Sequence, residues 1–228
     1  MKSESNKLAV RGELALIAMV IMNSAGVLLM LHSGSGISAI SSVPYGFQQV
    51  FPQLTLGTWT YMFQGLLVLV LMLLRRKFMP SYLFSFVVGF VFGKLMDLEK
   101  PFIDALPLNI PMRVLYFVLS YLILCFGISL GNRCGLPITP TDLFPREMAD
   151  ITKLPYARVK ITFDLTCLIT TAVITFVGVG AIRGLGIGTV VAACTMQKIQ
   201  DFIIPSSLRY KDIKHNRHIE GRRFVINS

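Results

Sequence analysis

The chain has 228 residues, of which 54% are hydrophobic and only 15% are charged, and its mean hydropathy is +0.64. About a quarter of the residues in a soluble domain are charged, so the composition excludes a soluble fold and indicates a polytopic membrane protein. The net charge of +10 does not indicate nucleic-acid binding, because no basic stretch alternates with aromatic residues and membrane proteins carry excess Lys and Arg in their inner loops.

Apolar runs along the chain predict six membrane-spanning helices, so the expected fold class is an all-α integral membrane protein. Each run is long enough to cross a hydrocarbon core of about 30 Å at about 1.5 Å per residue. The predicted spans are residues 14–31, 58–74, 80–98, 114–130, 159–180 and 184–204.

The remaining segments divide the chain into two halves and two ends. Residues 1–13 form a polar, cytoplasmic N-terminus, and the Pro-punctuated residues 99–113 form an external linker between the first half (14–98) and the second half (114–204). Residues 205–228 form a basic cytoplasmic tail, which is typical of an anchor to anionic membrane lipids.

The distribution of basic residues predicts the orientation in the membrane. With both termini inside, 18 of the 22 lysines and arginines fall on the inner side. The outer side keeps Lys94, Lys100, Arg113 and Arg183. An excess of this size predicts cytoplasmic N- and C-termini.

Two Gly- and Pro-broken stretches, residues 33–46 and 134–147, follow the first and fourth predicted spans. In and just before them, identical residues recur at an offset of 101 positions: Gly26, Gly34, Ile37 and Pro44 match Gly127, Gly135, Ile138 and Pro145. In the same register Ser38 falls on Thr139, and Ser41 falls on Asp142. The match indicates an internal duplication.

The duplication continues through the rest of each half, at offsets of 100 and then 104 positions. The further pairs are Gln64 with Asp164, Lys94 with Lys198, and Asp97 with Asp201. Each unit holds three spans, an odd number, so the second unit must enter the membrane from the opposite side. The sequence therefore predicts two inverted three-helix repeats, with broken or re-entrant loops after spans one and four.

Four segments have a distinctive order along the chain: GSGISAISSVPY at residues 34–45, LTLGTWTYMF at 54–63, VKITFD at 159–164 and GLGIGT at 184–189. In this order they resemble the YczE/YyaS/YitT-like family of multi-pass bacterial membrane proteins. The resemblance covers roughly residues 14–204 and implies a location in the bacterial inner (plasma) membrane. That family has no established biochemical activity, so the resemblance implies no catalytic or ligand-binding residues.

The two broken stretches predict a substrate-binding site. Secondary transporters place paired helix interruptions near the membrane centre, where free N–H groups and helix N-termini face the ligand. The candidate binding residues are Ser35, Ser38, Ser41, Ser42, Gln64, Thr139, Thr141, Asp142 and Asp164. The alternative is that both stretches are surface loops, each starting a short helix capped by Ser or Asp.

Asp164 lies about one turn inside the fifth predicted span, and Lys160 lies one turn before it. A carboxylate at this depth usually faces a partner or an aqueous path, which predicts a proton or cation relay. The alternative is a Lys160–Asp164 ion pair near the interface. Gln64, the repeat partner of Asp164, would meet it only if both helix faces turn inward.

Two further charged pairs have i, i+3 spacing near the ends of the third and sixth predicted spans: Lys94 with Asp97, and Lys198 with Asp201. Long basic side chains at span ends commonly extend to the interface, which predicts anchors. The alternative is a set of gate or interface ion pairs, one on each side of the membrane.

Two functions from different classes fit these features. The first is a secondary transporter of a small polar or anionic solute bound between the inverted repeats. The second is a non-transporting scaffold, or an accessory or substrate-binding subunit, which would bind a partner membrane protein or another copy of this chain. An enzyme is not expected, because the predicted spans contain no His and no nucleophile–base pair. The four cysteines are widely spaced, so the sequence predicts no metal site and no cofactor.

Overall fold

The computed structural model describes residues 12–76, 79–131, 138–186, 188–192 and 195. This part of the chain contains seven helices of at least 12 residues and no strand. The helices are α1 (Gly12–His32), α2 (Ala39–Val50), α3 (Leu56–Arg75), α4 (Pro80–Asp104), α5 (Ile110–Gly131), α6 (Pro140–Thr152) and α7 (Tyr156–Val179).

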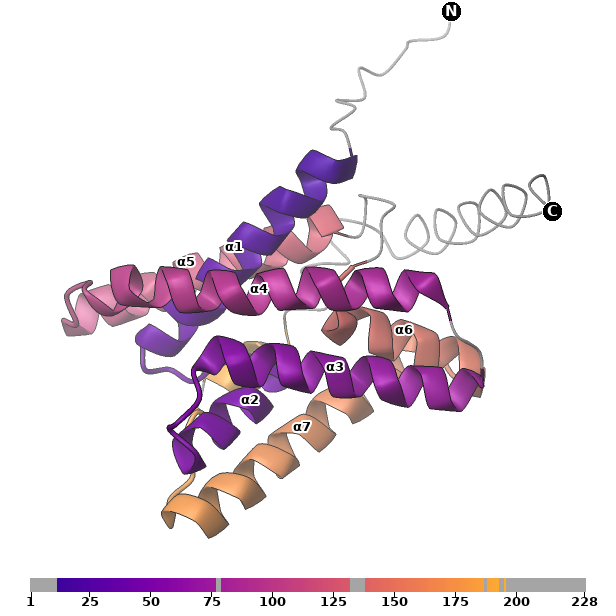
Figure 1. Ribbon diagram of the computed structural model, residues 1–228. Coiled ribbons are helices and arrows are strands. Elements are labelled where there is room, and N and C mark those ends of the chain that lie inside the picture. The colour runs from indigo at the N-terminus through magenta and orange to yellow at the C-terminus, as the bar shows by residue number, and fades with distance from the viewer. Residues whose placement is uncertain (1–11, 77–78, 132–137, 187, 193–194, 196–228) are drawn as a thin grey trace, which may run out of the picture.

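Five of these helices, namely α1, α3, α4, α5 and α7, are long and apolar enough to cross a membrane. They coincide with five of the six predicted spans. Most of the sixth (184–204) lies outside the described residues, as do residues 1–11 and the tail (205–228). A long, a short and a long helix follow one another twice, first as α1, α2 and α3 and then as α5, α6 and α7 (Figure 1).

The outer face of α7 shows why the chain needs a membrane. Its exposed apolar residues repeat every fourth position and form a stripe along the helix: Ile161, Leu165, Ile169, Val173 and Val177. Each would be costly to leave in water, at roughly 25 cal/mol per Å² of apolar surface. A stripe of this kind suits hydrocarbon, so the helices indicate a membrane-embedded protein.

The linker between the halves is shorter than predicted. Helix α4 continues to Asp104, past the predicted end of the third span at residue 98, and α5 already begins at Ile110. Two features let α4 continue: Lys100 pairs with Asp104 one turn on, and Pro101 removes only one helical hydrogen bond. Only residues 105–109 therefore leave the helical path.

The broken stretches are also more helical than predicted. In the first, only residues 33–38 are non-helical, because α2 begins at Ala39 and contains Pro44. In the second, α6 begins at Pro140 and contains Pro145, while residues 134–137 lie outside the described part. Each internal proline stands in the second turn and removes a single N–H, so both helices form despite it.

Helices α1 and α5 pack against each other through two glycines. A Cβ on Gly127 would stand 2.1 Å from Asn23 Oδ1, and a Cβ on Gly26 would stand 2.9 Å from Leu124 Cγ. Gly26 aligns with Gly127, and Asn23 aligns with Leu124, at the offset of 101 positions. The two contacts are therefore reciprocal, as in an interface between two copies related by a two-fold axis.

The short helices are held by the long helix of the other half: α2 packs on α7, and α6 packs on α3 (Figure 1). Between α2 and α7, Ser42 Oγ and Thr171 Oγ1 lie 2.7 Å apart. At the aligned positions of α6 and α3, Leu143 packs on the cluster that contains Leu71. Both halves thus contribute to one folded unit.

Candidate functional site

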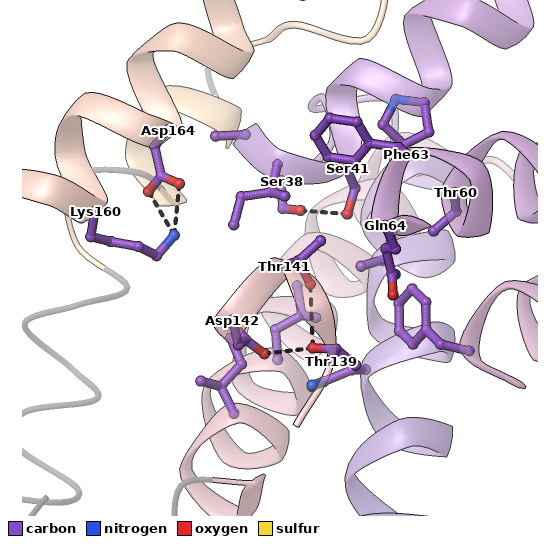
Figure 2. A pocket seen from close by; sticks show the side chains of 18 of the residues that line it. Ser38, Ser41, Thr60, Phe63, Gln64, Thr139, Thr141, Asp142, Lys160 and Asp164 are labelled. Carbon is purple, nitrogen blue, oxygen red and sulfur yellow. Dashed lines mark hydrogen bonds and ion pairs between the residues drawn. The ribbon is translucent and has the colours of Figure 1, made fainter. Parts of the chain in front are cut away.

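A cavity of about 120 Å³ lies where the N-terminal ends of α2 and α6 meet α1, α3, α4, α5 and the start of α7. Figure 2 shows most of the side chains that line it. Seven of the nine predicted binding residues lie in its wall: Ser38, Ser41, Gln64, Thr139, Thr141, Asp142 and Asp164. The structure therefore gathers residues that are up to 126 positions apart in sequence.

The other two predicted residues, Ser35 and Ser42, do not line this cavity. The carbonyl of Ser35 accepts a hydrogen bond from the Gly188 N–H at 2.9 Å. Ser42 is fully buried between α2 and α7, where its hydroxyl donates to the Ala39 carbonyl at 2.6 Å and contacts Thr171. Both serines therefore make structural contacts outside the lining of the candidate site.

Ser38 is the N-cap residue of α2, but its side chain does not cap the backbone. Its hydroxyl donates instead to Ser41 Oγ at 3.0 Å (Figure 2). The first turn of α2 contains no acidic residue. The positive end of this helix therefore faces the cavity without a side-chain acceptor on its N–H groups.

Thr139 is the N-cap residue of α6, and its φ and ψ of −54° and 144° resemble the −59° and 146° of Ser38. Its hydroxyl donates to Asp142 Oδ2 at 3.0 Å and accepts from the Thr141 hydroxyl at 3.3 Å (Figure 2). Asp142 lies in the first turn, where a carboxylate stabilises the positive end of the helix dipole. The two helix ends at the cavity therefore differ in charge compensation.

Lys160 and Asp164 form an ion pair in the cavity wall. Lys160 Nζ lies 2.6 Å and 2.9 Å from the two carboxylate oxygens, and the side chains are 21% and 15% exposed. The predicted i, i+4 pair is therefore present. Gln64 lines the same cavity as Asp164, so these two repeat partners do turn toward a common space.

Asn23 is the lining residue that most clearly escaped sequence analysis. It is 6% exposed, and its Oδ1 has no hydrogen-bond partner. Gln64 is 1% exposed, and its Oε1 likewise has none. A lone amide in the middle of an apolar span was the available signal, because polar residues inside spans commonly face the protein interior.

Glycines on the neighbouring helices make room for both amides. A Cβ on Gly89 would stand 2.0 Å from Gln64 Oε1, much as a Cβ on Gly127 would approach Asn23. Any larger residue at either position would displace the amide. The two amide oxygens are thus enclosed in defined positions against glycines, and neither oxygen has a hydrogen-bond partner among the described residues.

The predicted gate or interface pair of Lys94 and Asp97 is not formed. Asp97 accepts from Thr55 Oγ1 at 2.7 Å and from the Gly57 N–H at 2.9 Å, so it caps the start of α3. Lys94 instead lies 5.8 Å from the ring centre of Tyr61. A helix terminus with free N–H groups competes well for a carboxylate. Lys198 and Asp201 lie outside the described residues.

Two of the four cysteines, Cys125 and Cys167, are free and buried, as expected of small apolar residues. Cys134 and Cys194 lie outside the described part of the chain. Within that part, no group of three His, Cys, Asp or Glu side chains is arranged to hold a metal ion.

A family model described as a family of unknown function (DUF6198) matches residues 10–205. The chain belongs to this family, because the match covers most of its length. No curated protein and no solved structure matches the chain. The family description does not test the resemblance to the YczE/YyaS/YitT-like proteins, which stays a prediction.

Proposed function

We propose that this protein is a secondary transporter of the bacterial inner membrane, which binds a small polar or anionic solute between two inverted three-span repeats. The observation that carries the proposal is the cavity into which both short helices direct their N-terminal ends. In secondary transporters such ends, exposed at breaks between helices, bind the solute. Most predicted binding residues line this cavity, which agrees with the proposal.

Several structural details support the inverted repeat. The N-caps of the short helices, Ser38 and Thr139, occupy aligned positions, and so do the N-caps of α3 and α7, Thr55 and Pro155. The reciprocal glycine contacts between α1 and α5 add a pseudo-two-fold relation. Together with the distribution of basic residues, these features favour two halves of opposite orientation with cytoplasmic termini.

The size and chemistry of the cavity support a small solute. Typical sites for drug-sized ligands measure about 300–1,000 Å³, whereas this cavity measures about 120 Å³. Hydroxyl, amide and charged groups line it beside apolar residues such as Phe63 and Phe92. A solute of a few non-hydrogen atoms suits this space.

Flux through purified protein in liposomes tests the proposal. Suitable probes are urea, acetamide, glycerol, formate, acetate and nitrate, with protein-free liposomes as the baseline. We expect at least one probe to cross faster than the baseline, and Ser41→Phe, which fills the cavity, to abolish that flux. Ser35→Ala is the matched control, because Ser35 does not line the cavity.

Absence of flux for every probe would contradict the proposal and leave the scaffold or accessory-subunit alternative. That alternative also predicts that a stoichiometric membrane partner co-purifies with the protein and that Ser41→Phe has no effect on the complex.

A further inference from the structure

We infer that the solute is uncharged and that it forms hydrogen bonds to the side-chain amides of Asn23 and Gln64. The inference rests on the proposed function and narrows the substrate class of the same cavity. Three features of the cavity carry it: two buried amides in its lining, a balanced set of charged side chains, and backbone groups that supply both donors and acceptors.

Asn23 and Gln64 line the cavity and are more than nine-tenths buried. Their oxygens Oδ1 and Oε1 are enclosed against Gly127 and Gly89, so the amide N–H groups are the part of each side chain left for a molecule in the cavity. The neighbouring polar groups are paired among themselves: Ser38 with Ser41, Thr139 with Thr141 and Asp142, Lys160 with Asp164, and the Thr60 hydroxyl with the Leu56 carbonyl. Buried N–H donors favour a hydrogen-bond acceptor, and a molecule in the cavity can supply one.

The charges around the cavity balance. Two carboxylates, Asp142 and Asp164, face two basic side chains, Arg146 and Lys160, in its lining. Lys160 is bonded to both oxygens of Asp164, and Asp142 compensates the positive end of α6. An ion entering the cavity would leave water and meet no unpaired charged side chain, and the uncompensated end of α2 offers an anion only about half a positive charge. Removing an ion from water for so little compensation is costly. An uncharged molecule avoids that cost.

The backbone around the cavity supplies both donors and acceptors. The first turn of α2 directs N–H groups toward it without a side-chain acceptor. Pro44 leaves the carbonyl of Ile40 without an N–H four residues on, and Pro145 does the same to Thr141. With the amide N–H donors of Asn23 and Gln64, these backbone groups suit a molecule such as urea, a small carboxamide or a short polyol.

The size of the cavity agrees with such a molecule. Its volume of about 120 Å³ is several times the roughly 10–15 Å³ that a cavity needs to hold one water. A solute of urea or glycerol size can therefore displace the few waters that would otherwise satisfy the amides.

The chain itself suggests a substitution for testing Asn23. Leu124 occupies the aligned position in the other half and packs against Gly26 as Asn23 packs against Gly127. Asn23→Leu therefore reproduces a contact that this fold already makes, while it removes the amide. Gln64→Met removes the second amide at similar length. Ser85→Ala is the matched control, because Ser85 is also fully buried with an unpartnered hydroxyl but does not line the cavity.

The experiment compares urea, acetamide and glycerol with formate, acetate and nitrate in proteoliposomes, by light scattering after an osmotic step. We expect flux of at least one uncharged probe and none of the anions. Asn23→Leu and Gln64→Met should each lower that flux about tenfold or more, as the loss of a hydrogen bond from a buried site predicts. Ser85→Ala should leave it unchanged.

Three outcomes separate the inference from the proposal beneath it. If only anions cross, the inference is wrong and the transporter proposal still holds. The same is true if the Asn23 and Gln64 variants both transport urea, acetamide and glycerol as fast as the wild-type protein. No flux of any probe would overturn both. If Asn23→Leu does not give a monodisperse protein, Asn23→Asp replaces it, because this change keeps the shape, removes the two N–H donors and predicts the same loss.

Discussion

Glu147 on α6 accepts a hydrogen bond from the Tyr82 hydroxyl on α4, with 2.5 Å between the two oxygens. The same carboxylate forms an ion pair with Arg75 at the end of α3. At the aligned positions of the other half, Gly46 packs against Thr175 on α7. Helix α6 is therefore held by a buried ionic contact, and its stability should depend on the charge of Glu147. Helix α2 is held by small residues, and its stability should depend on the volume of the side chain at Gly46.

Glu147→Ala should destabilise the protein more than any other substitution in this contact. Breaking a buried ion pair costs about 3–5 kcal/mol of unfolding free energy, and Glu147 is only 7% exposed. Arg75 keeps 25% side-chain exposure and lies 3.8 Å from Asp150, so the loss should fall at the low end. Thermal unfolding in detergent measures it.

Two variants calibrate that result. Tyr82→Phe removes one hydrogen bond to a charged group and should cost about 1.5–3 kcal/mol. Asp150→Asn affects a longer, more exposed contact and should cost about 0–1 kcal/mol. Equal losses for the Glu147 and Asp150 variants would show that α6 is not held through Glu147.

Gly127→Ala should destabilise the protein although alanine is the better helix former. The new Cβ would meet Asn23 Oδ1 at 2.1 Å, and overpacking of this kind costs about 1–3 kcal/mol. That cost exceeds the gain of up to about 1 kcal/mol from replacing Gly by Ala in a helix. Unfolding midpoints of the purified variants give the sign.

The double variant Asn23→Ala with Gly127→Ala provides the control. Removal of the amide leaves room for the Cβ, so the double variant should be more stable than Gly127→Ala alone, and the two changes should not add. Gly26→Ala should be milder, because its Cβ meets the side chain of Leu124 at 2.9 Å rather than a close polar atom. Additive losses would contradict the proposed contact.

Much of the helical arrangement could be predicted, because long apolar runs in the sequence indicate membrane-spanning helices such as α1 and α5. The extents of the short helices could not, because Pro44 and Pro145 signal a break and yet stand inside α2 and α6. Tertiary packing of α2 on α7 and of α6 on α3 outweighs the single hydrogen bond that each proline removes.

The candidate site was predictable where the duplication marked it and not elsewhere. Ser38 and Thr139 stand out because they recur at aligned positions beside glycines and prolines. Asn23 has no such mark, since its aligned partner is Leu124. The role of Asp97 depends on which free helix end lies within reach, and only the packing of α4 on α3 decides that.

Asp97→Ala should lower the unfolding free energy by about 0.5–2 kcal/mol, the usual effect of removing an N-terminal cap. The Gly57 N–H and the Thr55 hydroxyl lose their acceptor in this variant. Lys94→Gln should have little effect, because Lys94 is exposed and not bonded to Asp97. Equal effects of the two substitutions in chemical unfolding would instead favour the gate or interface ion pair.

Asp164→Asn and Lys160→Met should each destabilise the protein, because each leaves one charge of a partly buried pair without its partner. The loss should lie between the few tenths of a kcal/mol of an exposed i, i+4 pair and the about 3–5 kcal/mol of a buried one. The exchanged pair, Lys160→Asp with Asp164→Lys, should recover part of it. Recovery of stability without recovery of solute flux would favour a relay role for Asp164.

Single cysteines at the ends of the short helices report whether both ends face one aqueous cavity. In a background without native cysteines, Ser38→Cys and Thr141→Cys should both react with a small water-soluble thiol reagent, because both positions line the cavity and are partly exposed. Ser42→Cys should stay unreactive, because Ser42 is fully buried against Thr171. Equal reactivity of all three positions would mean that α2 lies on the surface. The N-terminal end of α2 would then not line a cavity shared with α6.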